Sequence, residues 1–217
     1  LNSYGNTIVE EQISSRDHTE NILKKNTQAI KILKKRKKII KVQGKRYLNS
    51  LSLNIGGDPS SAAFFTALTL LNSHSTLKIK NVGLNHTRTG FYEILKKQKA
   101  KIKFANLKKE NNEIKGDIHI KSCKLTSIKT NSDWYPKTAD EFPILFVIAS
   151  LIKGTSVFKG IQDLANKESD RIKEMQKVIK QIGVNSSYSK GVLKIIGKGM
   201  VYANDKTITV PNLGDHR

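Results

Sequence analysis

The chain has 217 residues, with 39 lysines and arginines against 18 aspartates and glutamates, so its formal net charge is +21. That length is enough for one or two domains. The longest apolar stretches, 62–71 and 142–152, are shorter than the roughly 20 residues of a membrane span, and no secretory-signal pattern is visible. The single cysteine, Cys123, excludes an internal disulfide and a cysteine-based zinc site. We therefore expect a cytoplasmic protein with no membrane segment.

Hydrophobic periodicity predicts alternating helices and strands along the chain. In chain order we expect a strand at 6–11, a helix at 18–26, strands at 29–33, 39–43 and 51–55, a helix at 60–71, a strand at 76–82, a helix at 89–98, and strands at 100–105 and 113–120. The order then repeats, with helix 141–152, strand 155–158, helix 168–182, and strands 184–188 and 192–196. Corresponding helices lie about 80 residues apart, which indicates a duplicated α/β subdomain, and a third, partial copy lies upstream.

Three of the six arginines occupy one equivalent position in these copies. Arg16, Arg88 and Arg171 each stand seven residues before an apolar residue of a predicted helix, near the helix N-terminus. Helix N-termini favour anions, and an arginine adds bidentate recognition of carboxylate or phosphate. Two interpretations stay open. Either the arginines line a cleft for small anions, or each is neutralised by a local carboxylate, namely Asp17, Glu93 or Asp170.

Nucleic-acid binding is the alternative function from a different class. Lysines are scattered over nearly every segment, aromatic residues make up only 6%, and no zinc-finger or ribonucleoprotein motif is present. Nucleic-acid binders usually gather their charge on one face and interleave aromatic side chains. A basic cleft for small anions therefore explains the charge better than a polyanion partner does.

The densest charged segment begins the long predicted helix at 168–182. Lys167, Glu168, Asp170 and Arg171 fall within one and a half turns there, a pattern that alone is typical of a self-paired helix start. Asp140 stands at the start of the preceding helix of the same repeat, and residues 214–217 bring Asp, His and Arg together where a third helix would begin.

Six segments together resemble the 5-enolpyruvylshikimate-3-phosphate (EPSP) synthase family. They are SRDHTEN at 15–21, GDPSSAAFF at 57–65, GLNHTRTGFYEIL at 83–95, DEFPILFVIAS at 140–150, ANKESDRIKEM at 165–175 and GDHR at 214–217. The resemblance implies a two-domain α/β (α+β) enolpyruvyl transferase fold of repeated βαβαββ units, of which about half is present here. Residues 1–55 would be the tail of the first domain. Residues 56–217 would be the second domain, with two repeated subunits and the start of a third.

The resemblance further implies transfer of the enolpyruvyl group of phosphoenolpyruvate to the 5-hydroxyl of shikimate 3-phosphate. This implies small-molecule partners only, with no nucleic acid, no membrane, no metal and no cofactor, and a monomer at full length. As an internal or C-terminal fragment, the chain alone is expected to be inactive. The transferase of the same fold that acts on UDP-N-acetylglucosamine is the closest alternative enzyme.

The family's site residues carry over one at a time. Asp140 matches the aspartate that binds the shikimate hydroxyl and accepts its proton, and Glu168 matches the glutamate that moves a proton at the methylene carbon of phosphoenolpyruvate. Lys167 matches a lysine at the 5-hydroxyl, and Arg16 resembles an arginine that contacts shikimate 3-phosphate. Arg171 and Arg217 match the arginines that bind phosphoenolpyruvate. Such cations would offset the repulsion between two anionic substrates.

Overall fold

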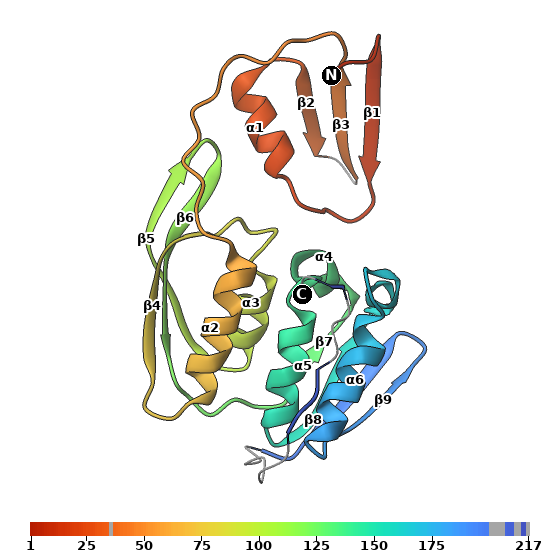
Figure 1. Cartoon of the computed structure of the whole chain (residues 1–217). Coiled ribbons are helices and arrows are strands. Elements are labelled where there is room, and N and C mark those ends of the chain that lie inside the picture. The colour runs from red at the N-terminus through yellow and green to blue at the C-terminus, as the bar shows by residue number, and fades with distance from the viewer. Residues whose placement is uncertain (35–36, 200–206, 211–213, 216–217) are drawn as a thin grey trace.

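A computed structural model describes residues 1–34, 37–199, 207–210 and 214–215. The N-terminal unit is a small α/β layer (Figure 1). Its elements are β1 (Asn6–Glu11), α1 (His18–Asn26), β2 (Ile30–Lys34) and β3 (Lys38–Gln43). The three strands form an antiparallel sheet in the order β1-β3-β2.

The second unit repeats this arrangement. Its elements are α2 (Pro59–Leu71), β4 (Thr76–Gly83), α3 (Gly90–Lys97), β5 (Lys101–Glu110) and β6 (Glu113–Lys121), and the sheet order is β4-β6-β5. Gly57, just before α2, forms a single parallel bridge with Val82 of β4. The bridge places the chain that enters α2 at the edge of the sheet, where a first strand of the unit would lie.

The third unit has the complete βαβαββ order. Its elements are β7 (Lys129–Thr130), a 3₁₀ turn at Ser132–Trp134, α4 (Tyr135–Thr138), α5 (Phe142–Leu151), β8 (Gly154–Lys159), a second 3₁₀ turn at Gln162–Asn166, α6 (Arg171–Gln181), β9 (Asn185–Ser189) and β10 (Val192–Gly197). The sheet order is β7-β8-β10-β9, with β7 parallel to β8. The repeat predicted from the sequence is thus confirmed, including the partial upstream copy.

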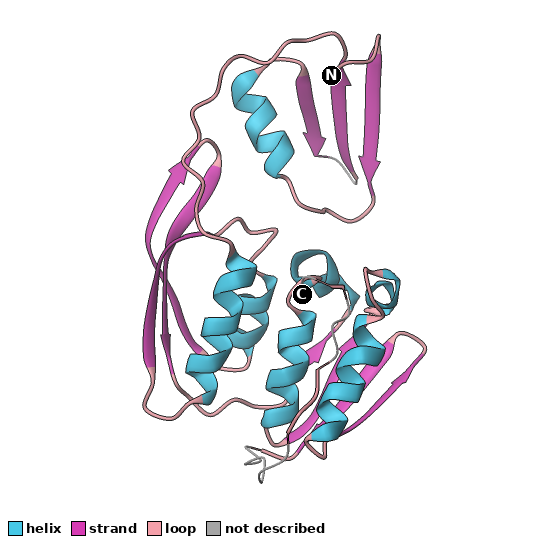
Figure 2. Cartoon of the chain, viewed as in Figure 1, coloured by secondary structure: helices cyan, strands magenta, loops and turns pink. Residues whose placement is uncertain are grey.

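The second and third units share one hydrophobic core. The helices α2, α5 and α6 pack side by side, with the sheets outside them (Figure 2). Phe142 and Phe146 of α5 pack against Phe158 of β8, and all three are fully buried. Aromatic side chains contribute much of the stabilisation in a core of this kind because each removes a large apolar area from water. The core therefore fixes the N-terminal ends of α2 and α5 relative to each other.

The N-terminal unit contacts the rest of the chain through polar groups. Glu113 of β6 accepts hydrogen bonds from Asn21 of α1 and from Asn85, and its carboxylate lies 3.0 Å from Nδ1 of His18. Asn85 also donates to Asp17, which precedes α1. This polar contact holds the start of α1 against the second unit.

Four expectations about local structure need correction. Residues 51–55 form no strand, although the apolar alternation favoured one, because they are the connection between the first two units. The helix expected at 168–182 begins at Arg171, since the side chain of Asp170 caps it by accepting from the N–H of Lys173. The helix expected at 141–152 begins at Phe142. The sequence did not predict β7, α4 or the two 3₁₀ turns, which are too short to show a period.

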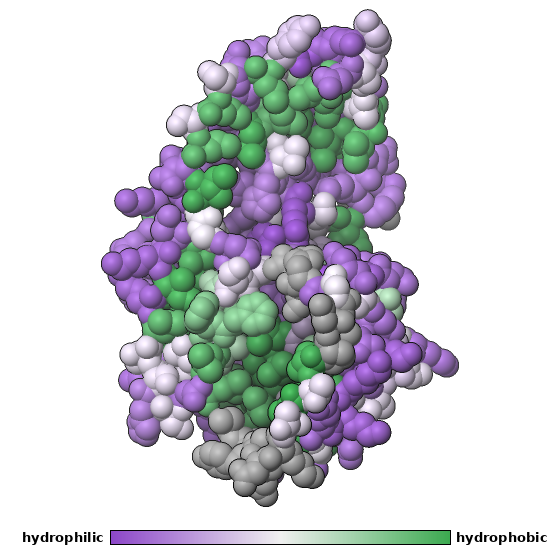
Figure 3. All heavy atoms as spheres, viewed as in Figure 1, coloured by the Kyte–Doolittle hydropathy of each residue, from purple (hydrophilic) through white to green (hydrophobic). Residues whose placement is uncertain are grey.

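Apolar side chains are exposed on one face of the molecule. Figure 3 shows them over the N-terminal sheet and around α2 and α5. On α2, Phe64, Phe65 and Leu68 are about half exposed or more. An exposed apolar face of this kind is typical of a surface that contacts another part of a protein. Within the described ranges, no helix is both long and apolar enough to cross a membrane, and no group of histidine, cysteine or acidic residues could hold a metal ion.

Candidate active site

Asp140 lies where the three units meet. It stands at the turn that leads into α5, and its side chain is 16% exposed. Its Oδ2 accepts a hydrogen bond of 2.5 Å from Nη2 of Arg16. The same oxygen lies 3.8 Å from Nη2 of Arg88, and the other oxygen, Oδ1, lies 3.9 Å from Nη1 of Arg171. The three arginines that share one position in the repeats therefore converge on a single carboxylate.

The three carboxylates that the sequence offered as local partners form no ion pair with these arginines in the described part of the chain. Instead they satisfy local groups: Asp17 accepts from Asn21 and Asn85, Glu93 from Thr89, and Asp170 from the N–H of Lys173. Of the two interpretations left open by the sequence, local pairing is therefore wrong. Arg16 and Arg88 pair with carboxylates of the third unit, because the sheets bring equivalent helix starts together, whereas Arg171 pairs with Glu168 of its own helix start.

Arg171 is the most deeply buried cation of the site. Its side chain is 4% exposed. Nε and Nη2 bind Asp215 at 2.8 and 3.0 Å, and Nη2 also donates to Glu168 at 2.8 Å. Burial disfavours the charge, yet the neighbouring carboxylates, Asp215 first, raise the pKa of Arg171 above its ordinary value. Nη1 is buried and has no hydrogen-bond partner among the described residues. An unsatisfied buried donor on a charged guanidinium is a ready contact for an anion.

Arg88 forms a second cluster, beside Asp140. Its Nη2 donates to Oγ of Ser60 at 2.6 Å and lies 3.4 Å from Oδ1 of Asp58. The Ser60 hydroxyl in turn donates to Glu141, which is 3% exposed. Burial raises the pKa of the Glu141 carboxyl, while Ser60 and Arg88 act in the opposite direction. This cluster connects the start of α2 with the start of α5.

The structure brings four of the six site residues expected from the sequence into one connected group: Arg16, Asp140, Glu168 and Arg171. Lys167 lies next in sequence to Glu168, and its ammonium group is 3.4 Å from Asp163. Asp163 also accepts a hydrogen bond from the Tyr135 hydroxyl. Arg217 lies outside the described residues.

Sequence reasoning missed Asp215, Ser60 and Glu141 as parts of the site. Asp215 was visible in the 214–217 segment, two residues before Arg217, and Glu141 directly follows Asp140. Ser60 is the first residue of the helix predicted at 60–71. Each makes its contacts within the site with residues at least 28 positions away, so no local spacing could indicate them.

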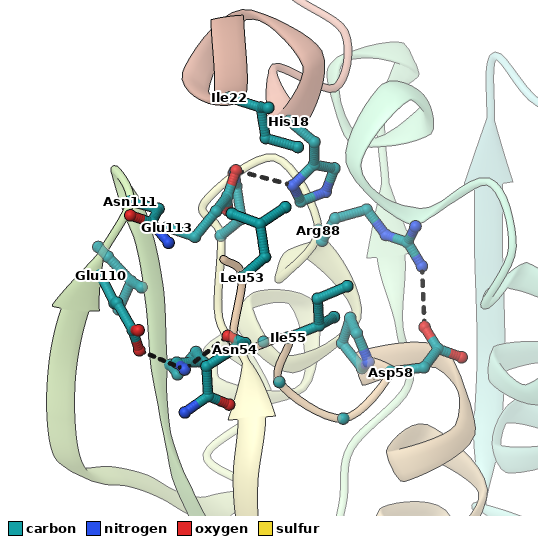
Figure 4. A pocket seen from close by; sticks show the side chains of 17 residues that line it. His18, Ile22, Leu53, Asn54, Ile55, Asp58, Arg88, Glu110, Asn111 and Glu113 are labelled. Atoms are coloured by element: carbon teal, nitrogen blue, oxygen red, sulfur yellow. Dashed lines mark hydrogen bonds and ion pairs between the residues drawn. The ribbon is translucent and has the colours of Figure 1, made fainter. Parts of the chain in front are cut away.

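A pocket of about 360 Å³ adjoins this site (Figure 4). Its walls include His18 and Ile22 of α1, the segment Leu53–Ile55, and the end of the β5–β6 hairpin. Asp58 and Arg88 line it as well, and the 3.4 Å ion pair between them is drawn in Figure 4. The pocket is thus bordered on one side by the polar contact of His18 with Glu113, and on the other by Arg88 of the arginine cluster.

The cluster is suited to small anions. Three arginines from different units surround one carboxylate, and a second carboxylate, Glu168, binds the most buried arginine. Cations of this density attract carboxylate or phosphate groups, and two carboxylates of different exposure can move protons at a bound molecule.

Comparison with known proteins places these features in context. The family model described as EPSP synthase (3-phosphoshikimate 1-carboxyvinyltransferase) matches residues 1–217. The 3-phosphoshikimate 1-carboxyvinyltransferase of Thermodesulfovibrio yellowstonii is 40% identical over 97% of this chain and 50% of its own length. The protein of the same name from Petrotoga mobilis is 36% identical over 100% of this chain and 49% of its own. The chain therefore spans about half the length of these curated relatives.

Two solved structures agree. EPSP synthase from Acinetobacter baumannii superposes with a TM-score of 0.80 at 35% identity, over 91% of this chain and 44% of the other. The enolpyruvyl transferase NikO from Streptomyces tendae has a TM-score of 0.60 at 12% identity, over 90% of this chain and 43% of the other, and so shares the fold alone.

Proposed function

Because this chain belongs to the EPSP synthase family, we propose that the polypeptide carrying it transfers the enolpyruvyl group of phosphoenolpyruvate to the 5-hydroxyl of shikimate 3-phosphate, with release of inorganic phosphate. The observation that carries the proposal is the convergence of Arg16, Arg88 and Arg171 on Asp140. Both substrates carry carboxylate and phosphate groups, and a site for them needs several cations around the group that accepts the proton.

Arg171 would bind phosphoenolpyruvate. Its Nη1 is buried and has no hydrogen-bond partner among the described residues, with Asp140 3.9 Å away, so a substrate carboxylate would bind it without displacing Asp215 or Glu168 from the other two nitrogens. We propose Arg217 as the second phosphoenolpyruvate ligand, on the match of the 214–217 segment to the family. Arg16, which is 43% exposed, would contact shikimate 3-phosphate at the outer edge of the cluster.

Asp140 and Glu168 would move the protons. Asp140 would accept the proton of the 5-hydroxyl as its oxygen bonds to the central carbon of phosphoenolpyruvate, with Lys167 at the same hydroxyl. Glu168 would donate a proton to the methylene carbon in that addition. It would take a proton back from the resulting methyl group as the C–O bond to phosphate breaks, so that the enol ether and inorganic phosphate form. Positioned acid–base groups of this kind typically contribute about 10²–10⁴-fold in rate.

The division of the chain at residues 55 and 56 into parts of two domains also remains a proposal, as do a monomeric state and a cytoplasmic location of the complete protein. The two rival functions, enolpyruvyl transfer to UDP-N-acetylglucosamine and nucleic-acid binding, have no observation in their favour in the comparisons.

The test uses the complete polypeptide, with the segments that its full-length relatives have in addition. Phosphate release from phosphoenolpyruvate is measured with shikimate 3-phosphate or UDP-N-acetylglucosamine as the acceptor. We expect release that depends on shikimate 3-phosphate alone. Release with the sugar nucleotide instead, or with neither acceptor, would overturn the proposal. Binding to duplex DNA that weakens steeply with salt would favour the nucleic-acid alternative.

A further inference from the structure

Arg88 joins the N-terminal ends of two helices that belong to different units. A single guanidinium nitrogen, Nη2, lies 2.6 Å from Oγ of Ser60 at the start of α2 and 3.8 Å from the carboxylates of both Asp140 and Glu141 before α5. The side chain is only 12% exposed. Its charge is therefore directed inward, at groups of the protein, whereas Arg16 at the same position of the first unit is 43% exposed.

The Ser60 hydroxyl has its hydrogen-bond direction fixed by Arg88. A hydroxyl has one proton to donate, and a guanidinium can only donate. Because Arg88 donates to Ser60, the serine proton is available for Oε1 of Glu141, and that hydrogen bond is formed. Ser60 is 2% exposed, so water does not compete for either partner. The result is a relay from Arg88 through Ser60 to Glu141.

The pKa of the Glu141 carboxyl depends on the hydrogen bond from Ser60 and on the charge of Arg88. The carboxyl is buried, which raises its pKa, and the adjacent Asp140 raises it further. Ser60 and Arg88 lower it, and Arg16 does so to a smaller extent. Tyr92 of α3 also faces this carboxyl, whose charge raises the pKa of the phenol. Of the two arginines, Arg88 lowers the pKa of Glu141 more, and it also connects the carboxylate to α2 through Ser60.

We propose that Arg88 is a positioning residue for Asp140: by anchoring the neighbouring Glu141 to α2 through Ser60, it keeps Glu141 from competing with Asp140 for Arg16. Without Arg88, two adjacent carboxylates would share Arg16, and Asp140 would lose its fixed place between the cations. The catalytic consequence rests on the proposed function, but the anchoring of Glu141 does not.

The anchoring is tested on the 217-residue chain without substrate. The carboxyl carbons of glutamate are labelled with ¹³C, and the titration of Glu141, assigned from its loss in Glu141→Gln, is followed by NMR in the wild type, Arg88→Gln and Arg88→Lys. We expect the midpoint to move to higher pH in Arg88→Gln and to return toward the wild-type value in Arg88→Lys, which keeps the charge. The control is Arg46→Gln, an exposed arginine outside the cluster. An unchanged midpoint in Arg88→Gln would overturn the proposal.

The catalytic consequence is tested in the complete enzyme. A displacement of about 1 Å in a reacting group can cost on the order of 100-fold in rate, so we expect Arg88→Gln to lower kcat by about 10- to 100-fold. The KM for phosphoenolpyruvate should change by less than about threefold, since Arg88 touches protein groups. A lower kcat together with an acid limb of the pH–rate profile moved to higher pH supports positioning. Equal kcat in the wild type and Arg88→Gln contradicts it.

Failure of the proposed function and failure of the proposed role of Arg88 would give different results. An inactive wild-type enzyme would refute the proposed function, while the NMR titration would still decide the anchoring of Glu141. If Arg88→Gln does not fold, as judged by circular dichroism, Ser60→Ala replaces it, because it removes the relay and keeps the arginine. In that variant the Glu141 midpoint should again move to higher pH, and a wild-type midpoint would count against the proposal.

Discussion

The second and third units carry the same pair of groups at the same places, yet they use them differently. The second unit has Asp58 before α2 and Arg88 before α3, and the third has Asp140 before α5 and Arg171 at the start of α6. Asp58 caps its own helix by accepting from the N–H groups of Ser60 and Ser61. Asp140 instead contacts arginines from all three units. The two carboxylates thus occupy equivalent places in the repeat. Asp58 caps its helix, whereas Asp140 forms ion pairs with the three arginines.

The two arginines differ in the same way. Arg88 is held by Ser60, Asp58 and Glu141, all at helix starts of the two central units. Arg171 is held by Glu168 and by Asp215 from the far end of the chain, and its Nη1 forms no hydrogen bond with any described residue. The same repeated position can therefore serve the structure in one unit and ligand binding in another. Which of the two it serves depends on how many of its hydrogen-bonding groups are already used by neighbouring residues.

The largest effect that would test this comparison is expected from Asp140→Asn. In the complete enzyme, turnover should fall by about 10²–10⁴-fold, because the amide cannot accept the proton of the hydroxyl. The matched variant Asp58→Asn should lose much less turnover than Asp140→Asn, since an asparagine also caps a helix. Steady-state rates of phosphate release give both values. Similar losses in the two variants would remove the distinction between capping and catalysis.

A smaller effect is expected from Arg171→Gln, which removes the Nη1 donor that has no hydrogen bond among the described residues. Hydrogen bonds to charged groups contribute about 1.5–3 kcal/mol, so phosphoenolpyruvate should bind about 10- to 100-fold more weakly. Isothermal titration on the complete protein measures the affinity, with Arg46→Gln as the control. An equal loss for shikimate 3-phosphate would contradict the assignment of Arg171 to phosphoenolpyruvate.

The smallest effect is expected from Asp58→Ala, and it concerns stability alone. Loss of the cap should lower the free energy of unfolding by about 1 kcal/mol at neutral pH. Burial opposes the charge of Asp58, but hydrogen bonds from Ser61 and Ser60 and the charge of Arg88 hold the pKa of its carboxyl below the ordinary value. A folded-state pKa below the unfolded one adds stability that is fully present above the unfolded pKa and is lost as the pH falls through the folded one.

The difference between the wild type and Asp58→Ala should therefore shrink in acid. Urea unfolding of the 217-residue chain at neutral and at acid pH measures it. A difference that grows as the pH falls would show that the carboxylate at position 58 does not stabilise α2.

The sequence by itself determined the elements and their repetition. The apolar periods predicted most helices and strands, because this signal depends on neighbours within a few residues. The equivalent position of Arg16, Arg88 and Arg171 was visible for the same reason. The strand expected at residues 51–55 was wrong because alternation alone does not supply a partner strand.

Only the tertiary structure decided which charges meet. Asp140 lies 124 residues from Arg16 in the chain, and Arg171 lies 44 residues from Asp215. The local carboxylates Asp17, Glu93 and Asp170, which sequence spacing offered as partners, are satisfied by other groups. Charge pairing is set by distance in space. Here that distance is fixed by the packing of α2 against α5 and by the way three similar sheets present their helix starts to one another.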